Sequence, residues 1–394
     1  MKTLCFSALI WHLLSLSLLW FSNNAVATDF KEIFTEQVLK DFSEQLPGYA
    51  VAVITPGSSF TLTHGVRKKG EPSLIDENTV FRLASVSKTF TPAAFILSQS
   101  SQQLDRPISA YLPELQFSRK DYQGQLTTRH LLSQTTGLIP HAYTNLVQAN
   151  VPYSRIVGQL KDVNFVCAPG KCYGYQNVVY SLAGDVIAKA SGQTYEAVVE
   201  QRIFRPLNMK DASFGLEAIT NNPNHALPHR WDKTQKQWQP IEHSAKYYSL
   251  APAAGVNATI KDMQQWLKAQ LGQYPKVLSE EQLHTMHTPH IKTTQKHAHY
   301  LQDSWEGVSD THYALGWRVF SFNGQAGFVH HGGWVKGFRI EMVFNRELGV
   351  GLVFLSNSES RIASDIVPRF IRLFLEGGYQ TASMPDCFQR PLPG

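Results

Sequence analysis

The pattern of apolar and polar positions divides the 394-residue chain into three parts. Near the start, helical spacing is followed by two alternating runs that predict a β-hairpin: helix 30–42, then strands 49–55 and 60–66. The middle of the chain is mostly helical in pattern, with helices predicted over 89–97, 128–133, 178–191 and 260–271. Strand patterns then return before a closing helix: strands 313–321, 328–331, 337–345 and 350–357, helix 364–376.

Strand patterns at both ends of the chain predict an α/β fold in which one sheet is assembled from the two termini. The terminal helices are expected to cover a face of that sheet, with the middle of the chain forming a helical lobe beside it. We therefore expect one domain over 28–384 and a short tail over 385–394. Its sheet lobe should comprise about 28–84 and 309–378, and its helical lobe about 85–308. A cleft between the lobes is the natural place for a site.

The N-terminal segment has the pattern of a secretory signal peptide. It starts with Met1-Lys2, continues with an apolar stretch from about residue 4 to 21, and ends in Ala25-Val26-Ala27. Residues 1–27 should therefore be removed by cleavage after Ala27. The alternative is an uncleaved membrane anchor, because the apolar run is long for a signal. Since no later stretch is apolar for long enough to span a bilayer, we expect a periplasmic or secreted protein without stable membrane insertion.

Charge and cysteine usage narrow the partners and the compartment. Lys and Arg number 36 against 31 Asp and Glu, and apart from residues 67–69 there is no basic block. We therefore expect no nucleic-acid partner. Export allows a disulfide, and the turn between Cys167 and Cys172 could bring these cysteines within bridging distance. Cys387 would then be a spare thiol in a polar tail.

The first candidate for chemistry is Ser85-Val86-Ser87-Lys88, which places a hydroxyl and an amine one helical turn apart. Residues three apart share a helix face, so Lys88 could take the proton of Ser85. Ser85 would lie near a helix N-terminus, where amide N–H groups favour developing negative charge. About one such spacing is expected by chance in a chain of this length, so its weight depends on the other candidates.

A tyrosine and an asparagine two residues apart supply the second candidate. Tyr175 and Asn177 stand between Pro169-Gly170 and the helix predicted over 178–191. A tyrosine close to a lysine and a helix dipole could be partly deprotonated and act as a general base, and the asparagine could bind a substrate amide. Tyr143-Thr144-Asn145 has the same spacing. We favour Tyr175 because of the Pro-Gly turn before it and the helix after it.

The third candidate is His331-Gly332-Gly333-Trp334, at the end of a predicted strand. Two glycines let the backbone approach a ligand closely. The Trp334 N–H, paired with the Ser85 N–H, would make a two-donor oxyanion hole, and His331 could hydrogen-bond the tyrosine or a substrate carboxylate. The alternative is a glycine hairpin beside a surface histidine.

In this order, the three candidates resemble the serine β-lactamase and DD-peptidase superfamily, in its class C-like branch. Further segments resemble recurrent pieces of that family: 81–90, 104–108, 111–113, 130–138, 253–256, 313–317 and 354–357. The resemblance implies a β-lactamase/transpeptidase-like fold, with an antiparallel sheet flanked by helices and an inserted, mainly helical lobe. It also implies an acyl-enzyme reaction on an amide, lactam or ester carbonyl, with no metal or organic cofactor.

By that resemblance, Ser85 is the nucleophile, Lys88 its proton partner and Tyr175 a base or proton shuttle. Asn177 would orient the substrate. His331 and Gly333 would form the inner wall of the site, with Trp334 beside them.

Two features depart from the family pattern. His331 stands where class C β-lactamases have a lysine, and an imidazole is only partly charged near neutral pH, so recognition of a substrate carboxylate should be weaker. Histidine is found there in some DD-peptidases, aminopeptidases and esterase-like members. Pro92 lies four residues after Lys88 and deprives the Lys88 carbonyl of its usual helical N–H partner, so a kink is expected there.

Several readings remain open. His284, His287, His290, His297 and His299 suggest a zinc site by their spacing, but Pro289 interrupts any helix and no nearby acid or cysteine completes the set, so no metal is expected. The leading hypothesis is an exported serine hydrolase of β-lactams or peptidoglycan-type peptides. An esterase or D-amino-acid peptidase on the same scaffold is the alternative, and a non-catalytic binding or envelope-scaffolding protein is a third.

Overall fold

The computed structural model describes residues 29–294, 296, 300 and 302–377. The expected signal peptide, the expected tail and Cys387 therefore lie outside the described residues. Within the described ranges, no helix combines the length and the apolar character needed to cross a bilayer.

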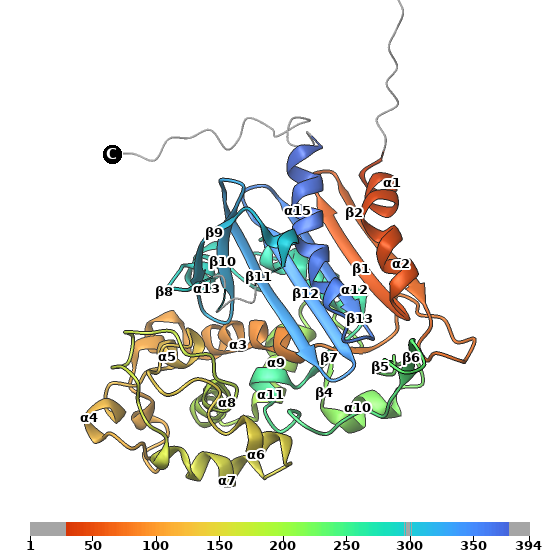
Figure 1. Cartoon of the computed structure of the whole chain (residues 1–394). Coiled ribbons are helices and arrows are strands. Elements are labelled where there is room, and N and C mark those ends of the chain that lie inside the picture. Colours follow the sequence, from red (N-terminus) through yellow and green to blue (C-terminus); the bar gives the residue numbers. More distant parts are fainter. Residues whose placement is uncertain (1–28, 295, 297–299, 301, 378–394) are drawn as a thin grey trace, which may run out of the picture.

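An eight-stranded antiparallel sheet forms the centre of the molecule, in the order β2-β1-β13-β12-β11-β10-β9-β8 (Figure 1). Its strands are β1 Gly48–Thr55, β2 Ser58–Gly65, β8 Ile291–Lys292, β9 Val308–Tyr313, β10 Arg318–Phe322, β11 Gln325–Val335, β12 Phe338–Asn345 and β13 Val350–Ser356. The N-terminal β1 pairs with the C-terminal β13, with Val51 opposite Phe354. The prediction of one sheet built from both chain ends, flanked by helices, is confirmed.

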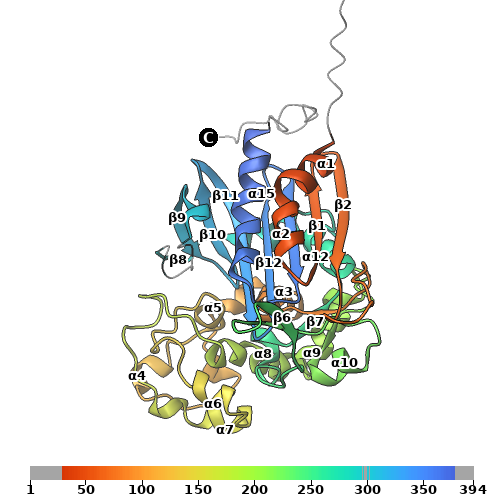
Figure 2. The ribbon, with the colours of Figure 1, turned by 45° about the vertical axis from the view of Figure 1, so that its right-hand side comes forward.

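Helices from both termini cover one face of this sheet (Figures 1 and 2). They are α1 Phe30–Phe34, a π-helical turn Thr35–Leu39, α2 Lys40–Gln45 and α15 Ile366–Glu376. Phe34 and Phe370 pack edge to face, with 6.0 Å between ring centroids, and Phe42 packs on Phe354 of β13 in the same way. These aromatic contacts belong to a buried cluster that joins the two chain ends, so the terminal helices stabilise the sheet by burying apolar area.

The other face of the sheet packs on a mainly helical lobe formed by the middle of the chain (Figure 2). Its helices are α3 Phe90–Gln99, α4 Lys120–Gln123, α5 Thr128–Leu132, α6 Thr144–Gln148, α7 Tyr153–Gly158, α8 Val178–Ser191, α9 Tyr195–Val199, α10 Gly215–Asn221, α11 Ala251–Ala254, α12 Ile260–Gln270 and α13 Glu280–His287. Two small sheets join them: β3 Phe81–Arg82, β7 Val256–Ala258 and β4 Ser213–Phe214, and the hairpin β5 His229–Asp232 with β6 Gln237–Pro240. The sequence pattern predicts a short extended run over 81–84, which contains β3, but it did not predict β4, β5, β6 or β7.

The single strand predicted over 313–321 is wrong. The structure breaks this run into β9 and β10, which pair with each other, with Tyr313 opposite Arg318. Gly316 forms the turn between them with a φ of +71°, a conformation that favours glycine. The apolar side chains of Leu315 and Trp317 are buried at this turn, so apolar character continues through it and conceals the break in the pattern.

Candidate active site

Ser85 lies at a sharp turn between the small sheet and the first helix of the helical lobe. Strand β3 ends at Arg82, Ala84 has a φ of +50°, and a 3-10 turn over Ala84–Thr89 leads into α3. A positive φ at alanine is sterically costly and persists only where the surrounding structure holds it. The residues that flank Ser85 are buried, whereas Ser85 keeps partial exposure. The turn therefore presents this hydroxyl at the surface of an otherwise closed segment.

Lys88 is fully buried beside Ser85 and contacts three oxygen atoms. Its Nζ lies 2.7 Å from Asn177 Oδ1, 2.9 Å from the Ala253 carbonyl oxygen and 3.4 Å from Ser85 Oγ. Burial, and secondly the positive charge of Arg318, hold the pKa of Lys88 well below its usual range. The structure thus brings the predicted serine and lysine together in a dry environment that favours the uncharged amine.

An uncharged amine accounts for all three contacts of Lys88. A neutral –NH₂ group has two N–H donors and one lone pair. The two N–H groups can be donated to Asn177 and to the Ala253 carbonyl, which are the shorter contacts. The lone pair is then left for the O–H of Ser85. In this arrangement the amine can accept the proton of the Ser85 hydroxyl.

The carbonyl of Lys88 has a side-chain partner, which explains how the proline four residues later is accommodated. Pro92 is the third residue of α3 and can donate no N–H. The buried Tyr180 hydroxyl donates to the Lys88 carbonyl instead, at 2.8 Å. Gly316 packs directly against this hydrogen bond, because a Cβ at Gly316 would lie 2.8 Å from both the Lys88 carbonyl oxygen and the Tyr180 hydroxyl. The helix therefore continues from Phe90 to Gln99 with the lost bond replaced.

Tyr175 lies next to both residues. The Lys88 Nζ is 4.9 Å from the centroid of its ring, and its hydroxyl hydrogen-bonds with Ser85. Burial raises the pKa of Tyr175, while the bond with Ser85 and the charge of Arg318 lower it, and the net direction is upward. We therefore expect a protonated phenol in the free protein rather than the partly deprotonated one suggested by the sequence.

The alternative tyrosine lies elsewhere in the lobe. The Tyr143 hydroxyl donates to the carbonyl of Gln159 at 2.8 Å, and Tyr143 precedes the short helix α6 with a φ of +59°. Asn177 stands at the start of α8, and its side chain accepts from Lys88 instead of capping the helix. The structure thus places Tyr175 and Asn177 at Ser85, whereas Tyr143 has a partner of its own away from this serine.

A disulfide and one glutamine hold the segment that carries Tyr175. Cys167 and Cys172 form the disulfide, which closes the turn before this segment. The side chain of Gln134 pairs with the backbone of Gln176 in both directions, accepting its N–H at 2.7 Å and donating to its carbonyl at 3.1 Å. Because both partners are buried, these bonds fix the backbone on one side of Tyr175.

Strand β11 forms the opposite wall through His331 and Gly333. A Cβ at Gly333 would lie 2.5 Å from the carbonyl oxygen of Leu83, so only glycine lets this strand pack against the turn before Ser85. The pairing of β10 with β11 ends at His330. Among the strands that the structure describes, residues 331–335 pair only with β12, which leaves one edge of this segment free of a neighbouring strand.

Both ring nitrogens of His331 have protein partners. Nδ1 lies 2.9 Å from the Gly332 carbonyl oxygen and must donate to it, so Nε2 accepts from the Tyr313 hydroxyl at 3.2 Å. Burial, then the charges of Arg318 and Lys88, hold the pKa of His331 well below its usual range. His331 is therefore a neutral, buried part of the wall. Trp334, in contrast, is 63% exposed.

Sequence reasoning missed two groups of the site. The Ala253 carbonyl, at the C-terminal end of the short helix α11, binds Lys88, and a backbone carbonyl has no signature in the sequence. Arg318 is buried, with its Cζ atom 5.9 Å from the centroid of the Tyr175 ring. No local sequence pattern marks it as a site residue, because its approach to Tyr175 depends on how strand β10 of the sheet packs on the helical lobe.

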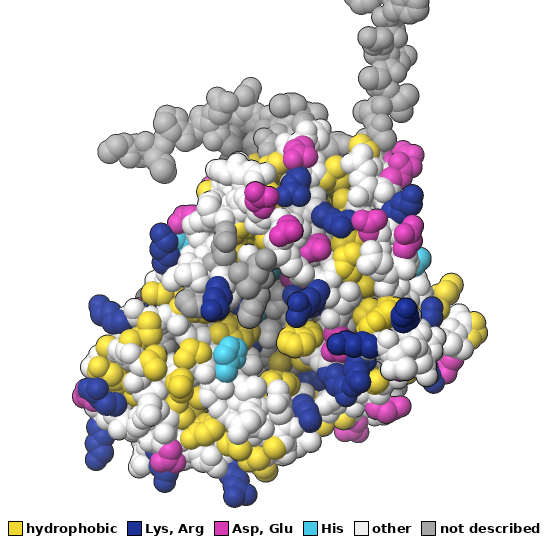
Figure 3. Space-filling model, in the orientation of Figure 1, with side chains coloured by type: hydrophobic (Ala, Val, Ile, Leu, Met, Phe, Trp, Pro, Cys, Tyr) yellow, Lys and Arg dark blue, Asp and Glu magenta, His cyan; other side chains and the backbone are white. Residues whose placement is uncertain are grey.

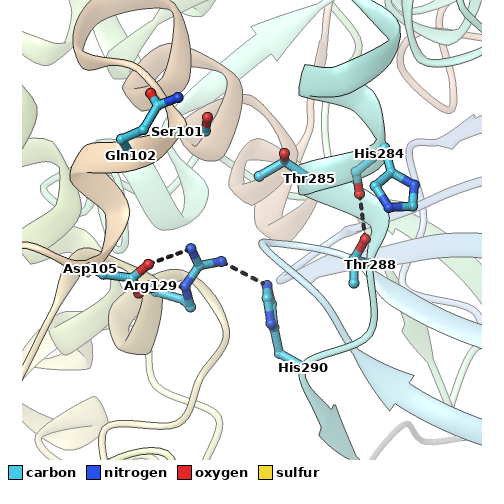
Figure 4. A pocket seen from close by; sticks show the side chains of 8 residues that line it. All are labelled: Ser101, Gln102, Asp105, Arg129, His284, Thr285, Thr288 and His290. Carbon is cyan, nitrogen blue, oxygen red and sulfur yellow. Dashed lines mark hydrogen bonds and ion pairs between the residues drawn. The ribbon is translucent and has the colours of Figure 1, made fainter.

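Three of the five histidines that suggested zinc, His284, His287 and His290, lie in the part of the chain that the structure describes. His297 and His299 lie outside the described residues, and within the described ranges no three His, Cys, Asp or Glu side chains are grouped to hold a metal ion. His290 approaches Arg129, which pairs with Asp105, at a cavity of about 310 Å³ (Figure 4). Ser85 does not line this cavity.

The surface shown in Figure 3 carries its charges without an extended basic face. Basic and acidic side chains are interspersed over the sheet lobe, and apolar side chains spread over part of the helical lobe.

Comparison with known proteins agrees with this fold. The family model described as Beta-lactamase matches residues 35–374. A beta-lactamase of Escherichia coli (strain K12) is 26% identical over 346 residues, covering 80% of this chain and 85% of the relative. A beta-lactamase of Pseudomonas fluorescens is 30% identical over 187 residues, covering 47% and 51%.

Solved structures show the same fold. The octameric penicillin-binding protein homologue from Pyrococcus abyssi superposes with a TM-score of 0.73 at 22% identity, covering 90% of this chain and 79% of the other. A penicillin-binding protein from Bacillus halodurans gives a TM-score of 0.69 at 21% identity, covering 86% and 98%. The chain belongs to the beta-lactamase family, within the serine β-lactamase and transpeptidase superfamily. Its relatives support a hydrolase of this superfamily.

Proposed function

We propose that this protein is a serine hydrolase that forms an acyl-enzyme on Ser85. The observation that carries the proposal is the environment of Lys88, a buried amine with two acceptors at 2.7 and 2.9 Å and its remaining contact to the serine oxygen. A lysine kept only as a structural cation would be expected to pair with a carboxylate. Here the three contacts are a hydroxyl, an amide oxygen and a backbone carbonyl, which suit a neutral base.

The proposed reaction follows from these contacts. Ser85 Oγ attacks the substrate carbonyl while its proton passes to Lys88 Nζ, and the N–H groups of Ser85 and Trp334 stabilise the oxyanion. The leaving group takes a proton from Tyr175, and the proton gained by Lys88 replaces it. Water then attacks the acyl ester and gives one proton to Lys88. Lys88 returns this proton to Ser85 Oγ as the ester bond breaks and the acid product leaves.

The substrates that we propose are those expected from the sequence, β-lactams or peptidoglycan-type peptide amides, in the manner of class C-like or DD-peptidase-like members. The curated relatives named beta-lactamase support this choice. One observation favours the second candidate, an esterase or D-amino-acid peptidase. His331 is neutral and both of its ring nitrogens are engaged, so it offers a substrate carboxylate neither charge nor a free donor.

We also propose that the protein works outside the cytoplasm. The signal-like pattern of residues 1–27 supports export to the periplasm or secretion. The disulfide between Cys167 and Cys172 agrees with an oxidising compartment, since such bonds are rare where thiols are kept reduced.

The test is the intact mass of the purified protein after brief exposure to benzylpenicillin or to a p-nitrophenyl ester. We expect one added acyl group on the wild type and none on Ser85→Ala. Ser98→Ala is the matched control, because Ser98 lies on α3 and its hydroxyl bonds its own helix at the Phe95 carbonyl. This control should be labelled like the wild type.

Each outcome decides between the hypotheses. A stable penicillin adduct supports a peptidase-like protein, and a short-lived one supports a β-lactamase. Labelling by the ester alone supports the esterase or D-amino-acid peptidase. If neither reagent labels Ser85, the acyl-enzyme proposal fails and the non-catalytic alternative gains support.

A further inference from the structure

Arg318 is a buried cation at the back of the site. It begins β10 and is 7% exposed. Its guanidinium Cζ lies 5.9 Å from the Tyr175 ring centroid and 5.6 Å from that of Tyr313, whose hydroxyl donates to His331. Arginine stays charged at any ordinary pH, so this position holds a permanent positive charge within the protein.

Arg318 and Lys88 lie against the same aromatic ring. The Tyr175 centroid is 4.9 Å from Lys88 Nζ and 5.9 Å from Arg318 Cζ, so the two cationic groups are at most about 11 Å apart. Two positive charges at this distance in a buried region repel each other. Because a lysine can lose its proton and an arginine cannot, the repulsion acts on the protonation of Lys88.

We propose that Arg318 is a positioning residue of the site, whose fixed charge behind Tyr175 keeps Lys88 in the neutral form that can accept the Ser85 proton. The inference rests on the proposed function, since it assigns Lys88 the role of base.

Other groups near the two residues act on the same equilibrium. Lys88 is faced by Ser85 on its own turn and by the Ala253 carbonyl on α11. Tyr175 and Asn177, which precede α8, and Tyr180 on α8 also face it. The charge of Lys88 also acts on His331 and His141. Arg318 is faced by Tyr173, Tyr175, Tyr300, Tyr313, His330 and His331. The nearby Glu341 interacts with His330 and Arg339. Burial is the larger cause of the lowered pKa of Lys88 and the charge of Arg318 is the second.

The size of the effect follows from the separation. Two unit charges about 11 Å apart, at an effective dielectric constant of about 20, interact strongly enough to move a pKa by about one unit. Removing the charge of Arg318 should therefore raise the pKa of Lys88 by about that much. Deprotonation of Lys88 in the variant then occurs at a higher pH than in the wild type.

The experiment compares the pH dependence of acylation by a p-nitrophenyl ester in the wild type, Arg318→Met and Arg318→Gln. We expect the ascending limb of kcat/KM to move up by about one pH unit in both neutral variants. Two neutral variants are used because glutamine can still hydrogen-bond the tyrosine hydroxyls if methionine prevents folding. The proposal is overturned if the limb stays at its wild-type position in a folded neutral variant.

A second measurement needs no turnover. A lysine whose folded pKa is lowered binds more protons when unfolded, so it makes stability rise with pH between its folded and unfolded pKa values. In Arg318→Met this rise in the urea midpoint should begin about one pH unit higher than in the wild type. In a Lys88→Met background the same change at Arg318 should move nothing. An identical onset with and without Arg318 overturns the inference, even if the protein acylates nothing and the proposed function has failed.

Discussion

Replacing the buried Tyr180 by phenylalanine tests how the chain after Lys88 accommodates Pro92. The variant keeps the ring and removes the hydroxyl that donates to the Lys88 carbonyl at 2.8 Å. A buried carbonyl left without its donor costs about 1–3 kcal/mol. Because Gly316 packs tightly against this carbonyl, water has little room to replace the hydroxyl, and we expect about 2 kcal/mol.

The replacement Pro92→Ala should reduce this cost. Alanine supplies an N–H four residues after Lys88, which is the usual helical donor for that carbonyl. In the Pro92→Ala background, Tyr180→Phe should therefore cost only about 1 kcal/mol, the net value of an ordinary hydrogen bond. The coupling between the two positions is then about 1 kcal/mol, above the scatter of about 0.3–0.5 kcal/mol seen for independent sites.

Urea denaturation of the four proteins of this cycle measures the coupling, followed by tryptophan fluorescence, since Trp266 and Trp317 are fully buried. The m-values must agree for the free energies of unfolding to be compared. As a check, 2 kcal/mol corresponds to about 3 °C in Tm for a domain of about 350 residues. Equal costs of Tyr180→Phe in both backgrounds would refute the idea that the hydroxyl replaces the missing N–H.

Two further changes probe the site itself. Asn177→Ala removes an acceptor that holds Lys88 Nζ at 2.7 Å. Without it we expect the lone pair of the amine to lose its alignment with the Ser85 hydroxyl and ester acylation to slow by about 10- to 100-fold. An unchanged rate would contradict this. Gly333→Ala places a Cβ 2.5 Å from the Leu83 carbonyl oxygen and should cost about 1–3 kcal/mol in urea unfolding, with slower acylation. Gly124→Ala, with open space around the new Cβ, is its control, and equal stability of the two variants would count against the packing argument.

The parts of the site that are local in sequence could be predicted. Ser85 and Lys88 share one turn, as their spacing predicted. The family resemblance implied that His331 and Gly333 form one wall, and the structure places them two apart on the same strand, where side chains share a face. The placement of Tyr175 rather than Tyr143 also agreed with the structure, because the Pro-Gly turn before the helix marked the correct segment. The sheet built from both chain ends followed from strand patterns at the two termini.

The remaining features depend on contacts that no local pattern records. The partners of His331 are a backbone carbonyl and a tyrosine on a separate strand, so its neutral, closed state could not be seen in the sequence. Arg318 approaches Tyr175 only because β10 pairs with β11 and β9, and the break between β9 and β10 was itself hidden by buried apolar side chains at the turn. The deprotonated state expected for Tyr175 was wrong in direction because the extent of burial is a tertiary property.

Burial is the first cause of the shifted protonation of all three titratable groups at the site. It favours the neutral forms of Lys88, Tyr175 and His331 alike, and the chemistry proposed for Ser85 uses the neutral amine of Lys88 and the protonated phenol of Tyr175. The burial of these side chains depends in turn on how closely the sheet lobe and the helical lobe pack. At Gly316 and Gly333 the sheet lobe meets the turn that holds Ser85 and Lys88 so closely that a Cβ would fall within 3 Å of a backbone oxygen. These close backbone contacts between the lobes therefore contribute to the acid–base properties of the site, although neither glycine has a side chain that could take part in the reaction.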